Sequence, residues 1–170
     1  MRFLIVAAAA LVFLSGCWSR NFDEPGKIDI EARPTETIIP GPFARVWAAT
    51  QAVMGKFTVV QRDLDASGQR AYIVTDWTRA KSDRLYHGFE PTRIPYTIHY
   101  RLYIYVLTDQ GGTRVTIKNE EQYLDDAVTA GIDFNGSLQQ WISTDSSTLK
   151  EARLLEEIEK LVRDPKFVIQ

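Results

Sequence analysis

The residues of this sequence that could carry out chemistry are few: one cysteine, two histidines and one pair of adjacent aspartates. Cys17 is the lone cysteine, which excludes an internal disulfide and any zinc site built from several thiolates. His99 lies mid-strand among tyrosines, where a residue of the sheet face is expected rather than a base, and His87 lies in a predicted loop. Asp125 and Asp126 are adjacent, whereas the paired carboxylates of a glycosidase come from separate elements that face a cleft.

Motifs of the common catalytic classes are missing from the sequence as well. It has no Gly-rich phosphate loop, no Gly-x-Ser-x-Gly turn and no His-Glu-x-x-His pair. The 20 Lys and Arg residues nearly balance the 22 Asp and Glu residues, which excludes a strongly basic nucleic-acid-binding protein. An apolar content of 45% excludes a disordered polyelectrolyte. We therefore expect a folded domain that is not an enzyme, with no metal and no nucleic-acid partner.

The first residues of the chain have the organisation of a secretory signal. Arg2 precedes an unbroken apolar run of 12 residues, from Phe3 to Leu14. A permanent membrane-spanning helix needs about 17–25 residues, so this run is too short to be one. A charged start, a short apolar middle and small residues at the end predict a signal peptide over residues 1–16.

The cysteine follows this run directly. Leu14-Ser15-Gly16-Cys17 resembles the bacterial lipobox, in which a signal peptidase cuts before a cysteine that becomes lipid-modified. The resemblance implies a diacylglyceryl thioether on Cys17 and an acyl chain on its new α-amino group, with no other cofactor. Such chains would hold the protein at a membrane at about 0.8 kcal/mol per buried CH₂. Trp18 stands where an aspartate favours the inner membrane, which implies the outer membrane, facing the periplasm. The alternative is an ordinary buried cysteine.

Residues 17–42 are predicted to be the lipidated cysteine and a flexible tether. They carry four of the seven prolines, and their apolar residues occur singly or in pairs without a sustained period. Ile28, Ile30 and the Ile38-Ile39 pair leave open the alternative that this segment binds a partner in extended form. The rest of the chain is predicted to be one domain over residues 43–163 and a C-terminal tail over 164–170.

The domain is predicted to be α+β, with an antiparallel sheet of about 4–5 strands packed against an N-terminal and a long C-terminal helix. Apolar spacing predicts a helix over 42–54, and Thr148 to Glu151 fits a capping box at the start of the last helix, which Asp164-Pro165 ends. Alternation predicts strands over 57–63, 70–78, 96–107 and 113–119. The long strand has one apolar face and one mixed face, with Thr97, His99, Arg101, Tyr103 and Tyr105.

Two connections, 79–95 and 120–147, are long for a compact domain, which is typical of functional or disordered loops. Aromatic residues and arginines commonly anchor protein interfaces. On this basis the candidate partner-binding residues are Arg84, Tyr86, Phe89, Tyr103, Tyr105 and Trp141. The alternative for Tyr86, Phe89 and Trp141 is that they only cover the edge of the sheet.

Several short motifs are similar to a known family. Val46-Trp47, a strand that ends in Asp63 before a glycine turn, Ile73 to Trp77 and Gly112 to Ile117 resemble the repeated domain of BamC/NlpB-type lipoproteins, over roughly residues 43–163. The resemblance implies a helix-grip fold, a membrane anchor and envelope protein partners. It also implies an accessory role in the machine that inserts β-barrels into the outer membrane, although those proteins carry two such domains. A second hypothesis is a periplasmic carrier or sensor that holds a small apolar ligand or lipid between sheet and helix.

Overall fold

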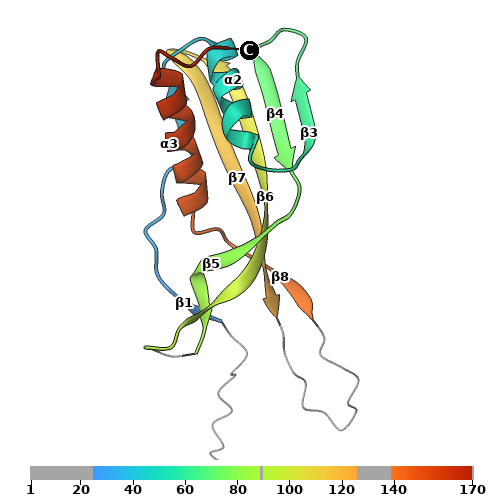
Figure 1. Ribbon diagram of the computed structural model, residues 1–170, viewed down its shortest axis with the longest axis vertical. Helices are drawn as coiled ribbons and strands as arrows, with labels where there is room; N and C mark the ends of the chain where they lie inside the picture. The colour runs from blue at the N-terminus through green and yellow to red at the C-terminus, as the bar shows by residue number, and fades with distance from the viewer. Residues whose placement is uncertain (1–24, 89, 126–138, 170) are drawn as a thin grey trace, which may run out of the picture.

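The computed structural model describes residues 25–88, 90–125 and 139–169. These residues form an α+β fold in which two helices lie on one face of an open antiparallel sheet of eight strands (Figure 1). The predicted signal peptide, Cys17 and Phe89 lie outside the described residues. Within the described part of the chain, neither helix is long and apolar enough to cross a membrane.

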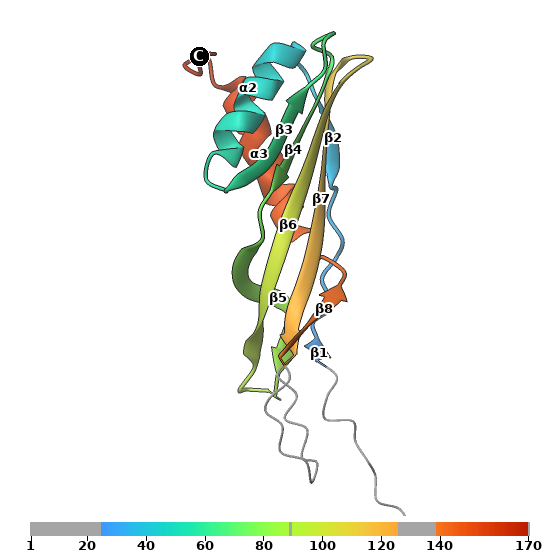
Figure 2. The same ribbon diagram turned by 90° about the vertical axis from the view of Figure 1, so that its right-hand side faces the viewer.

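A long β-hairpin runs the length of the molecule. Its strands are β6 (Ile94–Asp109) and β7 (Gly112–Asp125), which pair from Ile98↔Tyr123 to Asp109↔Gly112. The turn between them contains Gly111 with a φ of 92°, a left-handed conformation that glycine adopts without steric cost. β4 and β5 pair with β6, β2 and β8 pair with β7, and the outer strands β3 and β1 pair with β4 and β5 in turn (Figure 2).

The six remaining strands divide the sheet into an upper and a lower half, as drawn in Figure 1. The upper half has the order β3-β4-β6-β7-β2, and the lower half has the order β1-β5-β6-β7-β8. The upper strands are β2 (Glu36–Ile39), β3 (Val59–Leu64) and β4 (Arg70–Thr75). The lower strands are β1 (Gly26–Lys27), β5 (Thr78–His87) and β8 (Gln140–Thr144).

The helices α2 (Phe43–Met54) and α3 (Leu149–Arg163) cover one face of the upper half, and Figure 2 shows the opposite face without a helix. Arg45 of α2 ties the two helices together, because its Nε donates to the carbonyl of Val162 at 2.8 Å. Its Nη2 and Nη1 donate to the carbonyls of Asp164 at 2.5 Å and Phe167 at 3.1 Å. The Val162 carbonyl lies in the last turn of α3, where carbonyl groups have no partner within the helix, and the other two bonds hold the segment that follows α3 against α2.

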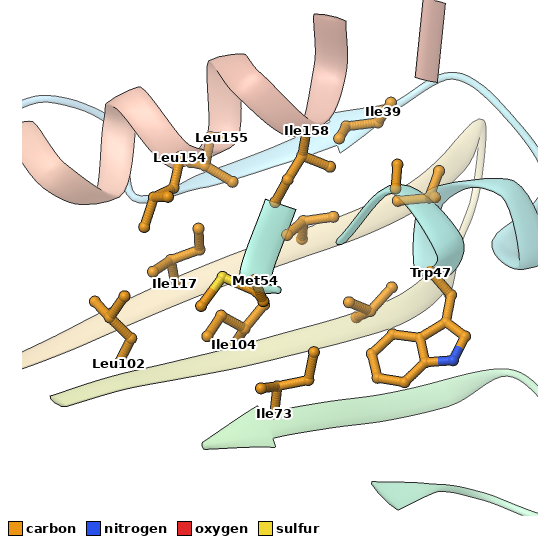
Figure 3. Close-up of a cluster of buried hydrophobic side chains, with 14 of the residues drawn as sticks. Ile39, Trp47, Met54, Ile73, Leu102, Ile104, Ile117, Leu154, Leu155 and Ile158 are labelled. Carbon is orange, nitrogen blue, oxygen red and sulfur yellow. The ribbon is translucent and has the colours of Figure 1, made fainter. Parts of the chain in front are cut away.

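The hydrophobic core fills the space between the helices and the upper half of the sheet (Figure 3). It forms because every second residue of β4, β6 and β7 is buried, and most of these buried side chains are apolar and point to the helices. Both helices turn an apolar stripe toward them. The following core side chains have no exposed surface: Ile39, Val46, Met54, Ile73, Ile98, Leu102, Ile104, Ile117 and Ile158.

The fold class and the main elements agree with the sequence. The predicted helix over 42–54 is α2, the last helix is α3, and the predicted hairpin is β3 and β4. The two faces of the long strand are also as predicted: Tyr96, Ile98 and every second residue to Val106 are buried, and the mixed face is at most partly buried. The two faces of this strand could be predicted from the sequence because β-branched and aromatic residues, which favour strands, dominate it.

The number of strands exceeds the predicted four to five. The connection 79–95 contains β5, and the connection 120–147 contains the end of β7 and all of β8. The predicted tether contributes β1 and β2, which corrects the expectation of a segment without elements. These strands lie at sheet edges or cross a register shift between Lys81 and Tyr86, so their sequences lack regular alternation.

The start of α3 also differs from the prediction. Thr148 has a φ of 63° and makes no capping bond to the helix. Its Oγ1 instead accepts a hydrogen bond from the backbone N–H of Arg33 at 2.7 Å, while Ser147 Oγ accepts one from the N–H of Leu149 at 3.4 Å. The capping box is therefore wrong, because the Thr148 hydroxyl is used to hold the segment before β2.

Candidate functional site on the open face of the sheet

The sheet face that no helix covers carries several partly exposed aromatic residues, and we call it the open face. On β6 it presents His99, Arg101, Tyr103, Tyr105 and Leu107, which alternate with the buried residues of the same strand. Strand pairing extends these residues into cross-strand rows, such as Tyr72–Tyr105–Thr116 and Val74–Tyr103–Lys118. Side chains in such rows are close enough to contact each other.

Three aromatic rings are stacked on the open face near the middle of the molecule. The ring of His99 lies between Trp77, at 4.1 Å between centroids and 24° between planes, and Trp141, at 3.7 Å and 8°. The stack is closed at its ends by two guanidinium groups, Arg101 at 4.8 Å from the Trp77 ring and Arg79 at 5.9 Å from the Trp141 ring. Since their broad faces are occupied by each other, these residues offer mainly their edges and charges to a partner.

The ring stack also explains the role of His99. Its Nε2 lies 2.6 Å from Oε1 of Gln122, the residue opposite it on β7. The stack joins four parts of the sheet, because Trp77 precedes β5, His99 lies on β6, Gln122 on β7 and Trp141 on β8. His99 is therefore a hydrogen-bonded residue of the sheet face, as the sequence indicated.

Tyrosines and charged residues continue the open face into the upper half. The hydroxyl of Tyr103 donates to Oε2 of Glu120 at 2.8 Å, and Nζ of Lys118 lies 5.8 Å from the centre of the Tyr105 ring. Tyr105 keeps 44% of its surface exposed and Leu107 keeps 37%. This area is therefore both apolar and accessible, with polar groups already held in fixed positions around it.

A charged network holds the edge of this face at β2. Arg114 of β7 contacts the carboxylates of Glu36 and Asp109, and Thr116 Oγ1 donates to Glu36 Oε2 at 2.7 Å. The bonds from Thr116 and Arg114 lower the pKa of Glu36, and the bond from Arg114 lowers the pKa of Asp109. Glu36 is exposed and Asp109 is partly exposed, so the network positions β2 more than it stabilises the fold.

Three of the six predicted partner-binding residues lie on the open face: Tyr103, Tyr105 and Trp141. Arg84 does not, because its Nη1 donates to the carbonyl of Ser146 at 3.3 Å. Tyr86 packs at the lower end, where its ring lies 2.6 Å from the position a Cβ would take at Gly26 and 4.6 Å from the guanidinium of Arg93.

The sequence missed the contribution of Trp77. Alternation placed Trp77 on the same face as Ala71, Ile73 and Thr75, which are buried. The strand instead ends at Thr75, and two residues outside any strand precede β5, so Trp77 reaches the opposite face and stacks on His99. The one sequence pattern that pointed to the open face was the alternation of His99, Arg101, Tyr103 and Tyr105 with apolar residues on β6.

A second polar cluster is buried near the start of α3. Glu121 of β7 is 1% exposed, and its Oε2 lies 3.4 Å from Nζ of Lys150 and 3.3 Å from Nδ2 of Asn119. Asp83 Oδ2 lies 3.9 Å from the same Lys150 nitrogen and accepts a 2.8 Å bond from Ser147 Oγ. Burial raises the pKa of Glu121, against the attraction of Lys150. This cluster connects β5, β7 and α3.

Within residues 25–88, 90–125 and 139–169, no group of three or more His, Cys, Asp or Glu side chains is placed to hold a metal ion. A scan against protein-family models finds no match to the sequence, and a search of curated proteins finds none either. The open face and the buried cluster are therefore interpreted from their own geometry.

Proposed function

We propose that this protein is a lipid-anchored, non-enzymatic interaction module of the bacterial envelope, attached through Cys17 to the outer membrane and facing the periplasm. The observation that supports it most directly is the open face, where Tyr103, Tyr105, Trp141 and the arginines beside them are partly exposed on a rigid sheet. Aromatic residues and Arg are enriched at the centres of protein interfaces, and a sheet holds them in place before binding. The partner is an envelope protein.

The arrangement of the helices supports a more specific proposal, a helix-grip domain with a role in β-barrel assembly. An antiparallel sheet packed against the long C-terminal helix α3 is what a helix-grip domain requires, with α2 beside it. Together with the BamC/NlpB-like motifs, this favours an accessory role in the assembly of outer-membrane β-barrels.

The packed interior argues against the carrier. A carrier would hold its apolar ligand between sheet and helices, where Ile104, Ile117 and Ile158 have no exposed surface and contact their neighbours in one continuous core (Figure 3). Lipid that co-purifies with the domain and is detected by mass spectrometry would reverse this preference.

Photo-crosslinking in cells tests the interaction module. A photoreactive amino acid at Tyr105, on the open face, is compared with the same amino acid at Glu156, an exposed position of α3. We expect one envelope protein to be captured at native expression from position 105 and not from 156. Capture of no envelope protein from position 105, or equal capture from both positions, would contradict the proposal.

The anchor has a separate test. Cys17→Ala should abolish metabolic labelling with a fatty-acid analogue and move the protein out of the membrane fraction, with Ser15→Ala as the matched control. If the Cys17→Ala protein stays in the membrane pellet, the anchor is not a lipid on this residue.

A further inference from the structure

The sheet ends at β3, and this edge strand has backbone groups available for pairing. β3 pairs only with β4, and no strand of the described residues lies beyond it (Figure 1). The N–H of Asp65 donates to the carbonyl of Arg70 at 2.9 Å, which makes this pair a hydrogen-bonded one. Because such pairs alternate along an antiparallel ladder, the backbone groups of Arg62 and Leu64 point away from β4, toward solvent.

The β3 edge is also weakly protected. Val60 keeps 55% of its surface exposed and Leu64 keeps 48%, and every residue from Val60 to Leu64 is exposed. Natural proteins usually shield such an edge with charged side chains, proline or an irregularity, and the charged residues of this edge are Arg62 and Asp63. Here the one irregularity is a register shift between Val59 and Gln61, which affects only the start of the strand.

A groove lies on each face of the sheet beside this edge. The outer groove, on the open face, has a volume of about 530 Å³ and is lined by Asp63, Arg70, Tyr72, Tyr105 and Leu107, among others. The helix-side groove has a volume of about 570 Å³. It is lined by residues of α2, by Arg62 and by the segment after α3, residues 166–168. Successive side chains of a strand point to opposite faces, so one added strand would place its residues in the two grooves alternately.

The charges of the two grooves differ and define which strand would fit. The helix-side groove contains the cations Arg62 and Lys166 and no acidic residue, so it fits acidic side chains. The surface of the outer groove is mainly apolar, from residues such as Tyr72, Tyr105 and Leu107, so it fits aliphatic or aromatic side chains. Its charged lining residues are Asp63, Asp65 and Arg70, whose negative excess disfavours acidic side chains there. The complementary segment therefore alternates acidic and apolar residues.

A second copy of this chain fits the edge less well. Directly opposite residues of an antiparallel pair point to the same face, so a two-fold pairing of β3 with itself is centred on a residue. Centred on Arg62, on Asp63 or on Leu64, it sets like charges directly opposite each other, which is destabilising, whereas a pairing centred on Gln61 does not.

We infer that the β3 edge binds an extended segment of a partner protein as an additional strand, with acidic residues toward the helices and apolar residues toward the open face. Main-chain bonds to Arg62 and Leu64 supply the attachment, and the two grooves supply the selection. This inference rests on the proposed interaction module and names the form of its partner, because the outer groove shares Tyr105 with the open face.

A designed peptide tests this inference on the full chain in detergent. The probe is the capped peptide Glu-Val-Glu-Tyr-Glu-Val-Glu, and the control peptide has Lys in place of each Glu. We expect the Glu peptide to bind at least about ten-fold more tightly than the Lys peptide. The Lys peptide lacks the contacts of Glu with the cations of the helix-side groove, and loss of one such contact gives a difference of this size. It should also slow the hydrogen exchange of the Arg62 and Leu64 amides, as measured by NMR.

Two variants separate strand addition from other binding. Arg62→Pro removes a donor that points to solvent together with the cation of the helix-side groove, and Leu64→Pro removes the second outward donor without changing a charge. Both should weaken the Glu peptide about ten-fold or more, whereas Gln61→Thr, whose backbone faces β4, should bind within about two-fold of the wild type. Tight binding of the Glu peptide by a folded Leu64→Pro protein would show that the charge of Arg62, and not strand addition, holds the peptide. Absence of binding, equal binding of both peptides, or protection of amides elsewhere would overturn the inference.

Two further outcomes also overturn it while leaving the proposed function in place. Concentration-dependent protection of the Arg62 and Leu64 amides without peptide would identify a second copy as the occupant. Unchanged capture by the Arg62→Pro protein of the partner crosslinked from Tyr105 would show that the partner uses the open face without the edge. Loss of that capture in Arg62→Pro, with Gln61→Thr unaffected, is the supporting result.

Discussion

The ammonium of Lys150 lies 3.4 Å from Oε2 of Glu121, and this contact joins the first turn of α3 to β7. The same ammonium is 3.9 Å from Oδ2 of Asp83, so one cation serves two carboxylates, and Oε1 of Glu121 has no hydrogen-bond partner. The cluster therefore has an excess of negative charge when both acids are ionised. Burial makes this excess costly, which raises the pKa of Glu121 above its ordinary value of 4.5.

The first prediction concerns the pH dependence of stability. Because the folded state holds the Glu121 proton more tightly than the unfolded chain, protonation stabilises the fold fully below about pH 4.5. This contribution is lost as the pH rises through the folded-state pKa. Glu121→Gln should lose less of its free energy of unfolding than the wild type between about pH 5 and pH 7.5, measured in urea. Glu156→Gln, at an exposed position of α3, is the control. Parallel pH profiles for wild type and Glu121→Gln would contradict the assignment.

A second prediction concerns the ring stack. His99→Ala removes two stacked contacts and should lower the free energy of unfolding by about 1–3 kcal/mol, since each aromatic pair contributes about 0.5–1.5 kcal/mol. The emission of Trp77 and Trp141 should shift to the red as both rings become more exposed. His99→Phe keeps the stack without the bond to Gln122 and should retain most of the emission spectrum. An unshifted spectrum in His99→Ala would show that the tryptophans do not depend on the histidine.

A third prediction concerns Arg45. Arg45→Met removes the donors to the carbonyls of Val162, Asp164 and Phe167 and should destabilise the fold by about 2–4 kcal/mol, because bonds from charged donors contribute about 1.5–3 kcal/mol each when buried and less when exposed. Hydrogen exchange at the end of α3 should quicken, while exchange in β6 should not. Arg153→Met, an exposed arginine of the same helix pair, is the control for charge removal.

A fourth prediction compares the core with the β3 edge. Ile104→Ala opens a cavity in the closed core and should cost about 2–5 kcal/mol. Val60→Ala, at a site that is 55% exposed, should change stability by less than about 0.5 kcal/mol. A large cost at Val60 would mean that the edge is already covered in solution, which denaturant titration across a range of protein concentrations would reveal.

The sequence predicted those parts of the fold where local pattern and tertiary packing agree. The six apolar residues from Tyr96 to Val106 could be assigned to one face because all six are buried there, and the five from Ile98 onward belong to one core. The open face could be predicted only in part: the residues of β6 alternate regularly, but Trp77 changes face where the chain leaves β4.

The missed strands share a physical cause. β1 and β2 have two and four residues, and they are held by pairing with β5 and β7 rather than by an apolar pattern of their own. β5 contains four charged residues because much of it faces solvent, so its sequence is typical of a loop. The strands that pair with β1 and β2 are far away in the sequence, so the periodicity of the β1 and β2 residues alone does not reveal the pairing.

The pairing of β1 with β5 limits the distance between a lipid anchor at Cys17 and the folded domain, and it determines which end of the domain would face the bilayer. Gly26 lies opposite Tyr86 at the lower end of the sheet, so only the nine steps from Cys17 to Gly26 separate an anchor at Cys17 from the folded protein. Nine extended residues reach at most about 30 Å, whereas β6 alone, with sixteen residues, extends for about 50 Å. An anchor at Cys17 would keep the lower end close to the lipid headgroups and hold the turn at Gly111, with the β3 edge beside it, farther from the lipid surface.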